Sequence, residues 1–254
     1  MVPPLYAGGA EIGGPAGHTY AAVLVDLGEA SCTRDDVLAA LRAVRFSGWL
    51  GRPENGRLVA VAASGGGTVA AGRRGVVGVG AWLADRLPVT VLAVRVLADR
   101  QLLLAMWSDG EELGCYVSDP SREPGAEDDV LAEPFGAEHG AAFAAAYGRP
   151  DAADDLTEIL AEQLDPDSVI ESERLARVLR LLELPTWLVA AATLPRDIPT
   201  GPQARDLTRL GAGVPGLIGR IPGRAVEVVR RRRPPPPAVT DPPRGSAGMD
   251  PWLW

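Results

Sequence analysis

The sequence contains no lysine, because all 25 basic residues among its 254 are arginine. A chain without lysine forms no Schiff base with a substrate, and it lacks the lysine of a Walker-type phosphate loop or of a kinase. Two histidines, His18 and His139, and two cysteines, Cys32 and Cys115, are too few and too scattered for a zinc site or a disulfide framework. We therefore expect no bound metal and no cofactor.

Long apolar runs are also missing. No stretch approaches the roughly 18 residues that a transmembrane helix needs, and residues 1–5 show neither the basic nor the apolar part of a signal peptide. With only two cysteines as well, the chain is expected to be cytoplasmic and to have no transmembrane segment. Its bias toward Ala, Gly, Arg and Pro is typical of a high-GC bacterial coding sequence.

The charge is negative overall and unevenly distributed. A net charge of −8 and a pI near 4.9 argue against general nucleic-acid binding, which requires basic surface. Residues 1–108 hold 10 Arg and 8 acidic residues, residues 109–171 hold 2 Arg and 18 acidic residues, and residues 172–254 hold 13 Arg and 7 acidic residues. Blocks of opposite sign can attract each other or serve separate partners, and two solvated faces are the simpler explanation.

The first half of the chain alternates apolar runs of strand length with helical patterns. Strands are expected at 20–27, 58–63, 89–97, 101–107 and 112–117, and helices from Thr33 and over 76–87. Thr33 and Asp36 have the spacing of a capping box, and Asp109-Gly110 fits a two-residue hairpin turn. This order predicts βαβα followed by an antiparallel three-strand meander, in a mixed sheet of about five strands with some parallel pairing.

The fold class predicted for the whole chain is α+β, or α/β in its first half. Five segments are expected: an irregular N-terminal arm (1–19), an α/β sheet core (20–120), an acidic loop or linker (121–136), a helical region (137–233) and a disordered Pro-rich tail (234–254). Within the helical region, Ser168 and Glu171 have the spacing of a second capping box. The apolar stretch 187–192 fits either a short helix or an added strand.

The Gly-rich loop 64–75 is the first candidate site. Gly67 and Gly72, followed by Arg73 and Arg74, have the glycine spacing of a phosphate loop but lack its Lys and its Ser/Thr. The two arginines and the N–H groups at a helix start suit an anion. A second interpretation is a nucleophile elbow at Ser64.

A Ser64 nucleophile requires a histidine base, and His139 follows it in a permissible chain order. The loop thus supports one alternative function, a small enzyme that either binds phosphate or nucleotide through Arg73 and Arg74 or hydrolyses substrates with Ser64.

The C-terminal tail is the second candidate site. Arg230–Arg233 and four prolines precede an end that carries Trp252, Leu253 and Trp254. Two tryptophans and a leucine expose costly apolar surface unless they dock on something. The leading hypothesis is a non-catalytic cytoplasmic binding or regulatory protein whose tail contacts a protein partner or docks on its own chain. The sequence predicts no oligomeric state.

Overall fold

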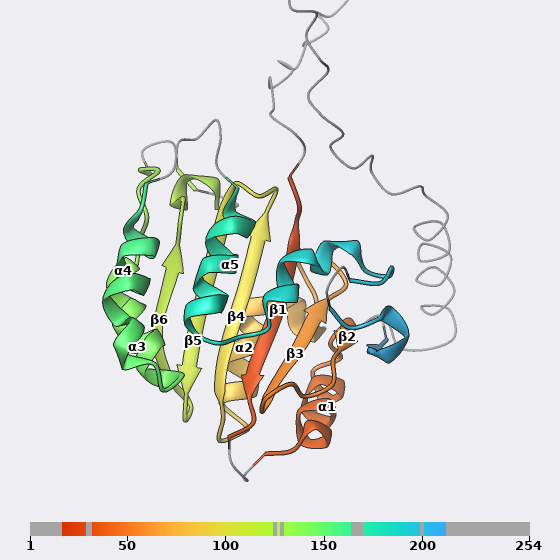
Figure 1. Cartoon of the computed structure of the whole chain (residues 1–254). Helices are drawn as coiled ribbons and strands as arrows, with labels where there is room; N and C mark the ends of the chain where they lie inside the picture. The colour runs from red at the N-terminus through yellow and green to blue at the C-terminus, as the bar shows by residue number, and fades with distance from the viewer. Residues whose placement is uncertain are drawn as a thin grey trace, which may run out of the picture.

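The computed structural model describes residues 17–28, 32–123, 126–127, 130–163, 170–198 and 201–211. Most of the predicted N-terminal arm, Ser168 and the whole tail with Trp252, Leu253 and Trp254 lie outside the described residues. In the described part, one sheet lies between two helical layers (Figure 1). The predicted α+β class is confirmed.

The sheet has seven strands in the order β6-β5-β4-β1-β3-β2-β7. The strands are β1 (Tyr20–Asp26), β2 (Gly48–Leu50), β3 (Arg57–Ala62), β4 (Thr90–Leu97), β5 (Gln101–Ser108), β6 (Glu111–Val117) and β7 (Thr208–Leu210). Every neighbouring pair is antiparallel, so the expected mixed sheet of about five strands is wrong. The two strands that the sequence did not reveal, β2 and β7, have only three residues each, too few for an alternating pattern.

The expected parallel pairing fails because a strand separates the ends of each crossover. Helix α1 (Arg34–Ala43) leads from β1 to β2, which run in the same direction, but β3 lies between them. Helix α2 (Val76–Ala84) likewise leads from β3 to β4, with β1 between them. Both crossovers are therefore split βαβ units. The apolar run of β1 indicated burial on both faces correctly, and such burial does not determine strand direction.

Helices α1 and α2 cover one face of the sheet, and they pack on the β1 side chains Ala21, Val23 and Val25. The Thr33 capping box is confirmed: the Thr33 N–H donates to Asp36 Oδ2 at 2.9 Å, and the Asp36 N–H donates to Thr33 Oγ1 at 3.3 Å. This cap fixes where α1 begins after β1.

The opposite face is covered by the segments that follow β6. These are α3 (Gly140–Ala146), α4 (Ala153–Ala161), α5 (Glu171–Leu181) and a 3-10 segment, η5 (Thr186–Thr193). Short 3-10 turns lie at Ala71–Arg73 (η1), Pro120–Arg122 (η2), Ala137–His139 (η3), Pro150–Ala152 (η4) and Ala204–Asp206 (η6). The ambiguous stretch 187–192 is thus helical, and segments 20–120 and 137–210 share one hydrophobic core. No helix among the described residues is long and apolar enough to span a membrane.

Candidate functional site

A cleft of about 320 Å³ lies where β6 ends and α5 begins. We call it the α5 cleft. Its lining comes from the turn after β4, the segment after β6 and the start of α5: Arg100, Ser118, Asp119, Arg122, Leu131, Ala132, Glu133, Pro134, Gln163, Glu171 and Arg174. This set contains three arginines and three carboxylates, so its formal charges balance.

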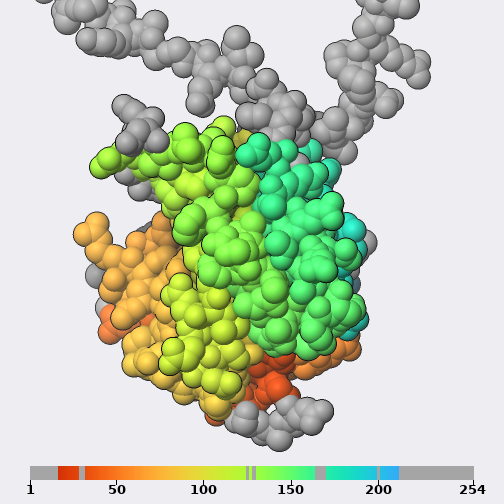
Figure 2. Space-filling model, turned by 90° about the vertical axis from the view of Figure 1, so that its left-hand side faces the viewer, coloured from red at the N-terminus to blue at the C-terminus, as the bar shows by residue number. Residues whose placement is uncertain are grey.

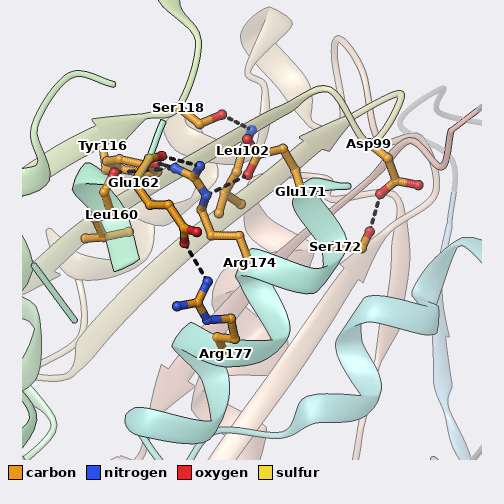
Figure 3. Close-up of polar contacts among 10 residues, drawn as sticks. All are labelled: Asp99, Leu102, Tyr116, Ser118, Leu160, Glu162, Glu171, Ser172, Arg174 and Arg177. Carbon is orange, nitrogen blue, oxygen red and sulfur yellow. Dashed lines mark hydrogen bonds and ion pairs between the residues drawn. The ribbon is translucent and has the colours of Figure 1, made fainter. Parts of the chain in front are cut away.

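A buried ion pair forms the floor of the α5 cleft (Figure 3). Glu171 Oε2 lies 3.3 Å from Arg174 Nε, and both side chains are only 2–3% exposed. Arg174 also donates to the Tyr116 hydroxyl on β6, to the Leu160 carbonyl at 3.4 Å and to the Glu162 carbonyl at 2.6 Å. One guanidinium thus joins α5 to β6 and to the open carbonyl end of α4.

The floor of the cleft gives Glu171 a role that the sequence did not predict. The expected partner Ser168 lies outside the described residues, and Ile170 occupies the N-cap position of α5, with no side-chain cap. Burial raises the pKa of the Glu171 carboxyl, against the opposing effect of Arg174. Burial also raises the pKa of the Tyr116 hydroxyl, so this group stays protonated and accepts from Arg174.

A second polar chain ties α5 to the first strand. The Tyr20 hydroxyl lies 2.9 Å from Ser172 Oγ, and the Ser172 hydroxyl donates to Asp99 Oδ1. The other Asp99 oxygen accepts the His18 backbone N–H at 2.6 Å. These contacts form one connected chain of hydrogen bonds that ties the start of α5 to β1 and to the turn after β4.

The rim of the α5 cleft is apolar and exposed. Its four side chains are the exposed large hydrophobic residues of the described chain: Val130 (36%), Leu131 (69%), Phe135 (60%) and Ile170 (45%). Leu131 lines the cleft, and each of the others is next in sequence to a residue that does. We call these four the apolar rim.

The segment that carries most of the apolar rim is attached to the edge of the sheet. Phe135 and Val117 exchange two backbone hydrogen bonds of 2.9 Å, which holds the segment against β6. In Figure 2 it forms the light-green upper end of the molecule. The rim is therefore presented on an anchored segment rather than inside the core.

The Gly-rich loop encloses a separate cavity of about 300 Å³, on the α2 side of the sheet. Of the predicted anion ligands, Gly67 and Arg73 line it, together with the first turn of α2 (75–78) and Arg95 from β4. Gly72 and Arg74 are not part of the lining. The Arg74 side chain turns back to its own loop, where it donates to the Ala71 carbonyl at 2.9 Å and lies 5.1 Å from the Trp82 ring centroid.

The two arginines of this cavity differ in their surroundings. Arg95 is largely buried and forms an ion pair with Glu123, so its charge is compensated. Arg73 is exposed, and no ion pair joins it to another residue that the structure describes. No side chain caps the start of α2 at Gly75, and its first turn has no acidic residue. The cavity can therefore attract a small anion through Arg73 and backbone N–H groups.

The structure does not bring Ser64 and His139 together. The Ser64 hydroxyl donates to the Gly66 carbonyl at 2.9 Å. His139 stacks on Phe143, with ring centroids 6.2 Å apart, and lies beside Gly114 of β6. Strands β5, β4 and β1 separate β6 from β3, which corresponds to about 19 Å.

Other reactive groups give no additional site in the described part of the chain. Burial raises the pKa of the Cys32 and Cys115 thiols, so both stay protonated near neutral pH. Among residues 17–211, apart from the gaps given above, no three His, Cys, Asp or Glu side chains form a group that could hold a metal ion.

Sequence reasoning missed the α5 cleft, although two signals for it were present. Apolar residues at 130, 131 and 135 interrupt an otherwise acidic loop, and Arg174 stands beside the buried stripe of Leu175 and Val178.

Comparisons of this chain with models of known protein families, with curated proteins and with solved structures found no match.

Proposed function

We propose that this chain is a non-catalytic binding protein of the cytoplasm, and that it takes up an apolar segment of a protein partner at the α5 cleft. One observation carries the proposal: the exposed large hydrophobic side chains of the described chain all gather around this one cleft. Exposed apolar groups that cluster at one place are typical of interaction surfaces. Binding pockets commonly combine apolar side chains with a few fixed polar groups, as this cleft does.

The chemistry of the floor supports binding rather than catalysis. Arg174 donates hydrogen bonds to Tyr116 and to two backbone carbonyls and is ion-paired with Glu171, and a group held in this way is poorly placed to move a proton. The acidic composition supports a protein partner over nucleic acid. The two free cysteines, Cys32 and Cys115, suit a reducing compartment. The tail ending in Trp252, Leu253 and Trp254 is the second interaction element of this proposal.

The test is a selection of displayed random peptides on the full chain. We expect enrichment of peptides rich in Trp, Phe and Leu, and at least about tenfold weaker binding of these peptides to Leu131→Ser/Phe135→Ser. Both side chains are more than half exposed, so the double variant should keep its fold.

A matched control is Val77→Ser, an apolar-to-serine change beside the Gly-rich loop cavity, which should leave peptide binding unchanged. Peptides that bind the double variant as well as the native chain contradict the proposal.

A second candidate function is anion binding at the Gly-rich loop, which the exposed Arg73 and the uncapped start of α2 favour. Inorganic phosphate or ATP at about ten times its Kd should raise the melting temperature by roughly 3 °C. Because Arg73 lines the cavity and Arg74 does not, Arg73→Ala should abolish the increase, and Arg74→Ala should retain it. An increase that survives Arg73→Ala rules out this site.

A further inference from the structure

We infer that the C-terminal end of this same chain, Met249–Trp254, occupies the α5 cleft, with Trp252 and Trp254 packed on the apolar rim. The inference rests on the proposed function, and it names the segment that occupies the α5 cleft before a protein partner binds. A protein partner then has to displace the chain's own terminus, which makes the tail a competitor built into the molecule. Apolar character, charge, reach and effective concentration each support this assignment.

Both the apolar rim and the C-terminal end of the chain carry large apolar side chains. The apolar rim offers Val130, Leu131, Phe135 and Ile170, and the terminus offers Trp252, Leu253 and Trp254. Tryptophan loses little conformational freedom for the large area that it buries, so two of them on four exposed apolar side chains form an effective anchor. Docking removes apolar surface from water on both sides of the contact.

A basic run upstream of the terminus is complementary in charge to the rim segment. The rim segment 126–138 contains five acidic residues and no basic one, and its described acids Glu127, Glu133 and Glu138 are exposed. The last part of the chain holds four consecutive arginines, Arg230–Arg233, upstream of its aromatic end. The aromatic end itself carries Asp250, so the attraction to the acidic rim segment comes from Arg230–Arg233 upstream, which steer the tail toward it.

The chain is long enough to reach. Trp252 follows Leu210 of β7 by 42 positions, which spans at most about 140 Å when fully extended. Strand β7 is at one edge of the sheet and β6, which ends at the cleft, is at the other. Seven strands cover only about 30 Å from edge to edge.

Attachment to the same chain favours this occupant over a second copy. A tethered segment has an effective concentration on the order of a millimolar at its own site. A second copy at micromolar concentration supplies far less of the same segment. The contact is therefore intramolecular at ordinary protein concentrations.

Fluorine NMR of the full chain, labelled with 5-fluorotryptophan, tests this directly. The chain has six tryptophans, and single Trp252→Phe and Trp254→Phe variants assign the two terminal signals. We expect both signals to be shifted from those of a labelled synthetic peptide of residues 249–254, and Leu131→Ser/Phe135→Ser to move them to the free-peptide positions. The other four signals show that the double variant is folded, and Val77→Ser should leave all six in place.

Two results overturn the inference. Terminal signals at the free-peptide positions in the native chain show that the terminus does not dock. Shifts that grow over a roughly 20-fold range of protein concentration assign the contact to a second copy. Displayed peptides that still bind at the α5 cleft in either case leave the proposed function standing, whereas their failure on a chain with an undocked terminus removes both.

Discussion

The two faces of the sheet are closed by different means. Helices α1 and α2 bury only apolar residues and one glycine, whereas α5 buries the charged pair Glu171 and Arg174 beside its apolar stripe. Packing on the α2 side depends on close approach, because a Cβ at Gly80 would lie 2.8 Å from Trp107 and 3.2 Å from Ala93. On the α5 side, packing depends on the Arg174 guanidinium, which joins α5 to β6 and to the end of α4.

This difference explains why the cleft is where it is. Apolar side chains fill a contact without leaving polar groups to satisfy, so the face under α1 and α2 can be dense and uninterrupted. Buried charges require partners, and the partners of Arg174 are arranged around the start of α5. The polar floor that results is fixed in position, and it supports the exposed apolar rim above it.

The largest expected effect comes from removing the guanidinium on the α5 side. Arg174→Met should lower the free energy of unfolding by about 3–5 kcal/mol, because Glu171 is left buried without its partner and the end of α4 loses two donors. Urea denaturation measures this.

The matched control is Arg177→Met on the same helix. Its ion pair with Glu162 is exposed on both sides, so the loss should stay below about 1 kcal/mol. Equal losses in the two variants mean that burial of the Arg174 pair is unimportant.

A smaller effect is expected on the α2 side, where close approach replaces the ion pair. Gly80→Ala places a methyl group against Trp107 and should destabilise the fold by about 1–3 kcal/mol, despite the better helix propensity of alanine. In Gly78→Ala the new methyl group meets only Arg74, at 3.3 Å or more, so this control should destabilise the fold clearly less than Gly80→Ala. A stabilised Gly80→Ala protein contradicts the close packing.

Sequence reasoning works best where a local pattern determines the structure. It located the strands of the meander, the start of α1 at Thr33 and the helix α2, because capping and periodicity act within a few residues. It missed β2 and β7 and misjudged strand direction, because the neighbours of a strand come from distant parts of the chain. An apolar run indicates that a strand is buried, but it does not indicate which strands pair with it or in which direction.

The candidate sites show the same limit. Spacing predicted an anion site at Gly67, Gly72, Arg73 and Arg74, and of these only Gly67 and Arg73 line the cavity at this loop. Spacing also grouped Arg74 with Arg73, although its side chain turns to Trp82. The α5 cleft was missed, because its floor joins Tyr116 to Arg174, 58 positions apart, and the local signals for it do not show this contact.

The pH dependence of stability also distinguishes the two faces of the sheet, since among the described helices only α5 buries an acidic and a basic side chain that form a pair. Burial raises the pKa of Glu171 in the folded protein, so the native state holds this proton more tightly than the unfolded chain does. The stability that wild type gains relative to Glu171→Gln is therefore complete below the unfolded pKa and is lost as pH rises through the folded pKa. The loss amounts to about 1.4 kcal/mol for each unit between the two pKa values.

Urea denaturation across this pH range measures the loss, and Glu173→Gln, a change at an exposed position of the same helix, is the control. A wild-type advantage that grows with pH means that the attraction of Arg174 outweighs burial at this site.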